Sequence, residues 1–336
     1  MGIADMGTHA KKLVRLVVRI AVATLLLTWV FSQVNIREFF QTVKAARWQY
    51  LAAVWLSTVA FFWLRSLTLQ IALKKQGCKV RMTTLFGATA VTALYAMILP
   101  EIVSTGVKWF ILKKDTGKGT NVLSSMLYNQ LSIIVTMILF GLAALAVTNP
   151  SSILLDETPN RWLLPVVCGL SLAATVVFSI LVLNKRSGGA VIKALKILAR
   201  PLPHTVRAKV EQILEQIALF QTAGPRFHLA VAAINVTACI VGCFFIYLAS
   251  AKAAGISVPV VTLVWLCAAV FLLGRLPISV ANLGVREVTL VGILSLYGVE
   301  KTSALLMSMV LFSSLIFMAA VGAAFQICWV AKANKT

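Results

Sequence analysis

Charged residues are scarce in this chain, and acidic residues are scarcer than basic ones. Of its 336 residues, 12% are charged and only 10 are Asp or Glu, whereas 60% are hydrophobic and the mean hydropathy is +0.93. A typical soluble domain has about 25% charged residues. This shortage excludes an ordinary soluble protein, because most of the folded surface must face an apolar phase.

Residue patterns that bind metals or perform nucleophilic catalysis are also missing. The three histidines, His9, His204 and His228, are scattered, and the six cysteines match no zinc or redox spacing. The sequence contains no GxxxxGK, HExxH or GxSxG motif. We therefore expect no catalytic residue, no metal, no cofactor and no ATP-driven step in this chain.

Basic residues give the chain a net charge of +21 and an isoelectric point of about 10.2. In a soluble protein this excess would indicate nucleic acid, but no nucleic-acid-binding motif accompanies it. Lys and Arg concentrate on the cytoplasmic loops of membrane proteins, where they orient helices and contact anionic lipid headgroups. We expect that role here and no nucleic-acid partner.

Long apolar runs fill most of the chain. A membrane-spanning helix needs about 20 mainly apolar residues. Six runs meet this requirement as simple spans: 13–33, 50–73, 121–148, 162–183, 227–251 and 303–330. The first resembles a signal peptide but no small-residue cleavage site follows it, so we expect it to be retained. We predict an all-α integral membrane protein in which residues 1–336 form a single transmembrane domain.

Two further apolar runs, 82–112 and 256–298, are interrupted by Pro, Gly and charged residues. A lipid-facing helix cannot contain such a break, because the freed backbone groups would lack hydrogen-bond partners. Basic residues flank both ends of the 82–112 run, which places both ends in the cytoplasm. We predict that each run is a re-entrant helical hairpin, the first one turning at Pro100–Gly106.

The predicted topology contains an inverted repeat. The units, about 50–148 and 227–330, each comprise a span, a hairpin and a span, and they run in opposite directions. Their hairpin tips are alike: LPEIVSTGVK from Leu99 and LPISVANLGVRE from Leu276 both contain Leu-Pro, a polar stretch, then Gly-Val and a base. Inverted repeats with broken helices are typical of transporters. Both chain termini are expected in the cytoplasm.

Residues 184–226 are the only long polar segment, and we expect them on the cytoplasmic side. An apolar helical stripe within them indicates an amphipathic helix lying on the membrane interface, although a role in binding a partner is an open alternative. The stripe consists of Val206, Val210, Ile213, Leu214, Ile217 and Phe220.

The hairpin tips are the predicted substrate site. Ionisable groups at membrane depth are costly and usually functional. Half-helices beginning just after Gly106 and Gly284 would direct free N–H groups at an anion, with Lys108 and Arg286 adding charge. The predicted binding residues are Pro100, Glu101, Ser104, Gly106, Lys108, Arg275, Pro277, Ser279, Asn282, Gly284, Arg286 and Glu287.

Several of these charges have alternative interpretations. Glu287 would pair with Arg286 or Arg275, or carry a proton coupled to transport, or the charges would only lock the two hairpins together. Arg65 is a secondary candidate that would otherwise extend to the interface. Asn129 and Gln130 are secondary candidates whose alternative role is hydrogen bonding between helices.

The second tip and the helix after it resemble the lysylphosphatidylglycerol synthase transmembrane family, which has a flippase-like domain. The matching positions are Pro277, Gly284, Arg286, Glu287, Gly298 and Val299, with Leu99, Pro100, Gly106 and Lys108 at the first tip. Ala281-Asn282 replaces a Gly-Gly pair and Glu101 replaces a Gly, which leaves the substrate open. The resemblance extends from about residue 13 to 330 and implies translocation of aminoacylated or sugar-linked lipids.

We therefore expect a flippase-like protein of a bacterial or archaeal cytoplasmic membrane, acting on a membrane phospholipid or a lipid-linked substrate. The family's soluble aminoacyl transferase domain is absent from this sequence, so we expect no lipid synthesis. Two alternatives stay open. One is a membrane-embedded transferase that acts on a lipid-linked sugar and uses outer-loop carboxylates such as Asp156 or Glu157. The other is an accessory subunit that binds a lipid- or glycan-synthesis enzyme through 184–226.

Overall fold

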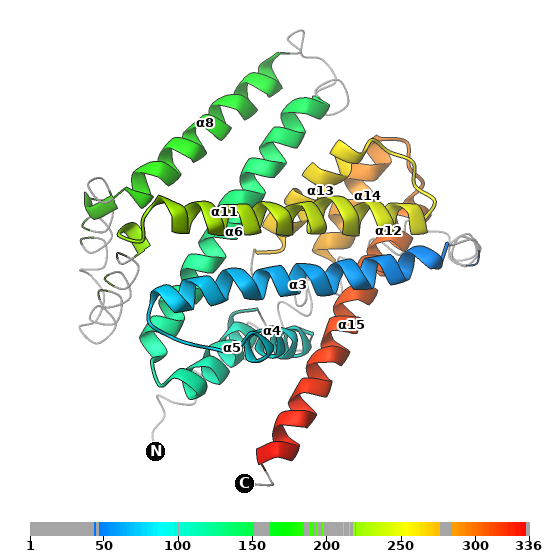
Figure 1. Ribbon diagram of the computed structural model, residues 1–336. Helices are drawn as coiled ribbons and strands as arrows, with labels where there is room; N and C mark the ends of the chain where they lie inside the picture. Colours follow the sequence, from blue (N-terminus) through cyan, green and yellow to red (C-terminus); the bar gives the residue numbers. More distant parts are fainter. Residues whose placement is uncertain are drawn as a thin grey trace, which may run out of the picture.

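The structure is a computed structural model that describes residues 47–97, 101–150, 162–184, 220–275 and 284–333, with a few isolated positions elsewhere. The isolated positions are 44, 99, 188–190, 193, 197, 211, 215 and 218. All regular structure in these parts of the chain is helical (Figure 1). The predicted first span, 13–33, and most of the predicted amphipathic segment lie outside the described residues.

Five helices are long and apolar enough to cross a membrane, and they match five of the six predicted spans. They are α3 (Gln49–Lys75), α6 (Gly119–Thr148), α8 (Leu163–Leu183), the continuous stretch Pro225–Ala253, and α15 (Lys301–Ala333). The integral membrane fold class is confirmed to this extent, and the ends of the predicted spans agree within a few residues.

The Pro225–Ala253 stretch is not a uniform α-helix. It consists of α11 (Pro225–Cys239), a π-helical segment η1 (Ile240–Ile246) and α12 (Tyr247–Ala253). π-Helical turns are rare and occur mostly as short insertions within α-helices. Here the wider turn lies in the middle of the span, where Gly242 faces Phe61 of α3.

Both interrupted runs form pairs of short helices. The first pair is α4 (Met82–Ala96) and α5 (Glu101–Thr116), and the second is α13 (Val260–Leu273) and α14 (Val285–Leu296). At 1.5 Å per residue, helices of 12 to 16 residues reach about 18–24 Å, less than the roughly 30 Å hydrocarbon core. α4 contacts α5, and α13 contacts α14. The re-entrant course of the two runs through a membrane stays a prediction.

The two ends of the first hairpin lie side by side. Lys118 Nζ donates a hydrogen bond to the Gly77 carbonyl at 3.4 Å, and Asn121 Nδ2 donates to the Gln76 carbonyl at 3.2 Å. The basic loops before α4 and after α5 are therefore adjacent. This geometry agrees with the expectation that the run enters and leaves on one side.

The turn of the first hairpin differs from the prediction. α5 begins at Glu101, so Gly106 lies inside the helix rather than before it, and the expected helix start after Gly106 is wrong. Proline is common at the first positions of a helix, and the sequence has a proline at position 100, directly before Glu101. In the second hairpin the expected start is confirmed, since α14 begins at Val285 directly after Gly284.

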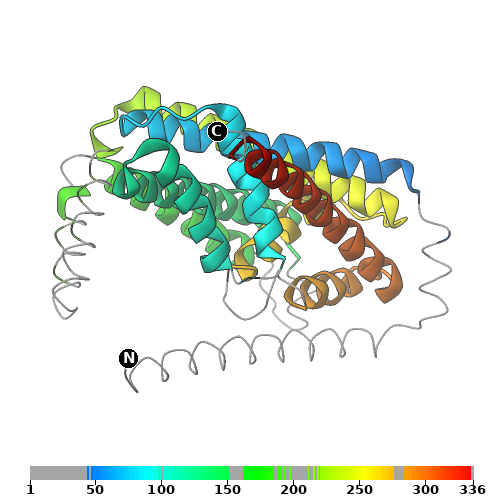
Figure 2. The same cartoon turned by 90° about the horizontal axis from the view of Figure 1, so that it is seen from below.

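Helices of the two predicted repeat units pack against each other. α4 packs along α15 of the second unit, and α13 packs along α6 of the first unit. α3 of the first unit lies antiparallel to α11–α12 of the second unit (Figures 1 and 2). At one end the Arg47 N–H donates to the Ala253 carbonyl at 3.1 Å, and near the other end Thr68 Oγ1 lies 3.4 Å from Asn235 Oδ1. The opposite orientation of the units across the bilayer stays a prediction.

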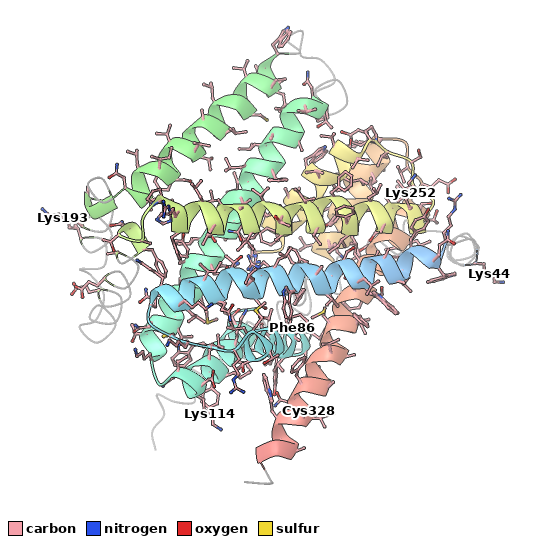
Figure 3. The ribbon with its side chains drawn as sticks, viewed as in Figure 1. Lys44, Phe86, Lys114, Lys193, Lys252 and Cys328 are labelled. Atoms are coloured by element: carbon pink, nitrogen blue, oxygen red, sulfur yellow. The ribbon has the colours of Figure 1, made fainter. Side chains whose placement is uncertain are left out.

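Side chains at the edges of the bundle suit an apolar surrounding. α8 packs mainly on α6 and exposes large apolar residues such as Leu170 and Phe178. Four lysines lie at the periphery: Figure 3 shows Lys44 and Lys252 on one side of the bundle, with Lys114 and Lys193 away from them. Phe220, the one described member of the predicted stripe on 184–226, is buried and stacks on Tyr128 at 4.2 Å.

The contact between α4 and α15 depends on glycine. A Cβ added at Gly322 would lie 2.2 Å from the Ala90 carbonyl oxygen, so the two helix backbones would have to separate. We predict that Gly322→Ala lowers the free energy of unfolding by about 1–3 kcal/mol. The matched control is Gly292→Ala on α14, where an added Cβ meets nothing within 4 Å. Thermal unfolding in detergent measures both, and equal unfolding temperatures would contradict the prediction.

Candidate functional site

The second interrupted run resumes as a helix at α14, and the Glu287 side chain caps the start of that helix. Gly284 precedes the helix with φ +85°, a conformation that glycine adopts without a Cβ clash. Its backbone N–H donates a hydrogen bond to Glu287 Oε2 at 2.7 Å. A glutamate three residues into a helix can reach back in this way, and the positive end of the helix dipole favours its charge.

The same carboxylate binds Arg286. The Arg286 Nε donates to Glu287 Oε1 at 3.1 Å, and Nη2 forms an ion pair with the same oxygen. Both residues are buried, with Arg286 5% and Glu287 4% exposed. A buried charge is tolerated when it is paired and hydrogen-bonded. The prediction that Glu287 pairs with Arg286 is confirmed.

Ser308 of α15 joins the two charges. It receives a hydrogen bond from Arg286 Nε at 2.8 Å and donates one to Glu287 Oε1 at 2.8 Å. The Arg286 guanidinium also lies over the Phe312 ring, with Cζ 5.2 Å from its centroid. The charges therefore fix α14 to the span α15. The alternative that they lock the two hairpins to each other stays a prediction. One guanidinium nitrogen, Nη1, makes no hydrogen bond within the described residues.

A second polar cluster lies where α3, α5 and α6 meet. Arg65 Nη2 donates a hydrogen bond to Gln130 Oε1 at 3.2 Å, which links α3 to α6. Lys108 of α5 is half-buried and near enough for its charge to interact with that of Arg65. Three helices thus contribute polar or charged side chains to this cluster, which makes it a candidate site.

Sequence reasoning overlooked the polar side chains that continue this cluster toward α11. Asn235 Nδ2 donates to Ser132 Oγ at 3.0 Å, and Thr68 Oγ1 lies 3.4 Å from Asn235 Oδ1. Asn129 is 4% exposed, and within the described part of the chain its Oδ1 receives no hydrogen bond. Asn235 is an amide within the apolar run 227–251, and this feature of the sequence could have identified it as a candidate.

The remaining predicted residues are spread more widely. Ser104 is fully buried on α5, whereas Gly106 is exposed and an added Cβ there would meet nothing within 4 Å. Arg275 follows α13, and its guanidinium lies over Phe271 at 4.6 Å. Pro100, Pro277, Ser279, Asn282 and the side chain of Glu101 lie outside the described residues.

Comparison with known protein families matches residues 16–322 to the lysylphosphatidylglycerol synthase TM region. The chain belongs to this family. The match includes both helical hairpins and both polar clusters, and it confirms the resemblance read from the sequence. A lysylphosphatidylglycerol synthase TM region is a membrane domain with a lipid-related function. No curated protein and no solved structure shows a significant match to the chain.

The buried ion pair between Arg286 and Glu287 leads to a prediction about the free energy of unfolding. Arg286→Ala would leave the Glu287 carboxylate buried without its partner, and we predict a loss of about 3–5 kcal/mol in the free energy of unfolding. The double variant Arg286→Met/Glu287→Gln removes both charges and keeps an acceptor for the Gly284 N–H. We expect it to unfold much closer to the wild type, because replacing a whole buried pair is often neutral.

Denaturant titration of the purified protein in detergent measures both variants. The prediction fails if the single variant is as stable as the wild type, or if the double variant is the less stable of the two.

Proposed function

We propose that this protein moves an anionic lipid between the leaflets of a bacterial or archaeal cytoplasmic membrane, with the headgroup passing the two polar clusters. The observation that carries the proposal is the presence of three cations within the apolar helical bundle: Arg65 and Lys108 are half-buried, and Arg286 is buried. Charges at such depth are rare in membrane proteins and mark substrate or ion pathways.

The Arg286 cluster has the features of an anion site. The guanidinium is held by Glu287, Ser308 and Phe312, and its Nη1 donates no hydrogen bond to the residues that the structure describes. Arginine presents its donors in a plane that matches phosphate, and a fixed side chain loses little entropy when it binds. On this proposal Glu287 has two roles, to cap α14 and to orient the arginine.

The two short-helix pairs act as the re-entrant hairpins of a transporter. Their short lengths, the adjacent basic loops around the first pair, and the exchanged packing of α4 with α15 and α13 with α6 support this role. Broken helices with their ends near the membrane midplane form the substrate sites of transporters with inverted repeats. The chain itself performs no covalent chemistry in this scheme, and both termini lie in the cytoplasm.

Reconstitution into vesicles tests the proposal. A fluorescent phosphatidylglycerol is placed in both leaflets, and a membrane-impermeant quencher reports how fast inner-leaflet lipid becomes accessible. We expect the wild type to accelerate this exchange for the anionic lipid over a zwitterionic phosphatidylcholine. Protein that leaves the rate at that of protein-free vesicles would contradict the proposal.

Two variants separate the transport role from stability. Lys108→Gln removes a half-buried cation that has no ion pair within the described residues, and Arg286→Met/Glu287→Gln removes a balanced pair. We expect each to slow exchange about tenfold or more, because a hydrogen bond to a charged group contributes about 1.5–3 kcal/mol. The control is Lys252→Gln at an exposed position. Folded variants with wild-type rates would overturn the assignment.

A further inference from the structure

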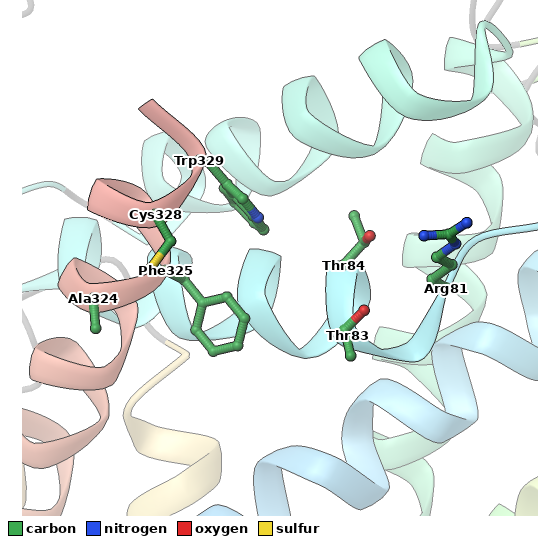
Figure 4. A pocket seen from close by; sticks show the side chains of 7 residues that line it. All are labelled: Arg81, Thr83, Thr84, Ala324, Phe325, Cys328 and Trp329. Atoms are coloured by element: carbon green, nitrogen blue, oxygen red, sulfur yellow. The ribbon is translucent and has the colours of Figure 1, made fainter. Parts of the chain in front are cut away.

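A groove of about 460 Å³ opens where the start of α4 meets the end of α15, away from both polar clusters. Its lining is divided by chemistry, as Figure 4 shows: one wall comes from α4 and the other from α15. The lining residues are Arg81, Thr83, Thr84, Ala324, Phe325, Cys328 and Trp329. A groove of this size is in the range of sites for small ligands.

The α4 wall is cationic and rich in hydrogen-bond donors. Arg81 is exposed, and within the described part of the chain its guanidinium has no ion pair or hydrogen bond. Thr83 and Thr84 likewise make no side-chain hydrogen bond there, although Thr89 and Thr92 further along α4 donate to their own helix. Arg81 also precedes α4 without a side-chain cap, so the N–H groups of the first turn stay available.

The α15 wall is apolar. Phe325 and Trp329 lie against Gly87 of α4, where an added Cβ would come within 2.8 Å of both rings. The rings therefore form a fixed surface beside the cationic wall. Tryptophan at the end of a membrane helix typically marks the level of the lipid headgroups.

We propose that the groove binds an anionic phospholipid of the cytoplasmic leaflet, with its phosphate at Arg81 and its acyl chain along Phe325 and Trp329. Charge complementarity favours this ligand. Arg81, which has no ion pair within the described residues, fits a phosphate together with the threonine hydroxyls, and the adjoining aromatic wall fits a hydrocarbon chain. The basic loop that contains Lys79 and Arg81 places the groove on the side where anionic lipid attracts positive charge.

This site is independent of the transport proposal, since it shares no residue with the two polar clusters and requires only binding. Its measurement therefore has a separate readout. Cys328 lines the groove and is exposed, whereas Cys78, Cys168, Cys239, Cys243 and Cys267 are buried. A maleimide label thus reports occupancy of the groove through Cys328, and the buried thiols report whether each variant is folded.

The experiment follows the rate of Cys328 labelling in a neutral detergent with added phosphatidylglycerol, phosphatidylcholine or inorganic phosphate. We expect phosphatidylglycerol to slow labelling about fivefold at roughly four times its dissociation constant, because protection follows 1 + [L]/Kd. Arg81→Gln should abolish the effect and Arg81→Lys should keep part of it. Lys114→Gln, which removes an exposed charge of α5 outside the groove, is the matched control and should keep all of it.

Three results would overturn the proposal. Equal protection by phosphatidylcholine would show that the phosphate contact with Arg81 selects nothing. Equal protection by inorganic phosphate would identify an anion site without a lipid chain. Unchanged protection in folded Arg81→Gln, with the five buried thiols unlabelled, would remove the residue on which the site is built.

Discussion

A helix that stops within a hydrocarbon phase must satisfy its terminal N–H groups from within the protein, because the surroundings offer no hydrogen-bond partner. At the start of α14 the Glu287 carboxylate accepts a hydrogen bond from one such group, the Gly284 N–H. A buried carboxylate in turn requires a positive partner, and Arg286 with Ser308 provides it. The Glu287 side chain therefore links three features: the start of α14, the ion pair with Arg286, and the attachment of α14 to α15.

Much of the helical architecture could be predicted from the sequence, because apolar runs of sufficient length leave few alternatives. The start of α14 was also predictable, since Gly284 precedes an Arg-Glu pair of which the glutamate can reach back to it. The start of α5 was misplaced because Gly106 was given the same role. Gly106 adopts ordinary helical backbone, and the proline at position 100 was the better indicator.

The partners of the charged residues were harder to foresee. Ser308 is one of several hydroxyl residues on α15, and its spacing does not distinguish it from the others. Asn235 joins α11 to α3 and α6 only after the chain has folded back over more than a hundred residues. Contacts of this kind depend on how the helices cross, which a single sequence does not specify.

The two halves of the molecule use positive charge in different ways. Arg286 is held by a carboxylate on its own helix, whereas Arg65 is held by the neutral amide of Gln130 and lies near another cation. The contacts of the two arginines thus differ in chemistry: one is an ion pair with a carboxylate, and the other is a hydrogen bond to an amide.

The π-helical segment explains how one span keeps a continuous buried face. Buried pairs on the Pro225–Ala253 stretch recur every four residues, at 238/239, 242/243, 246/247 and 250/251. An α-helix turns about 100° per residue, so a four-residue period drifts by roughly 120° over the 12 residues between the first and last pairs. The wider turn of η1 absorbs this excess rotation. The segment therefore keeps the successive buried pairs on the side of the span that contacts α3 and its neighbours.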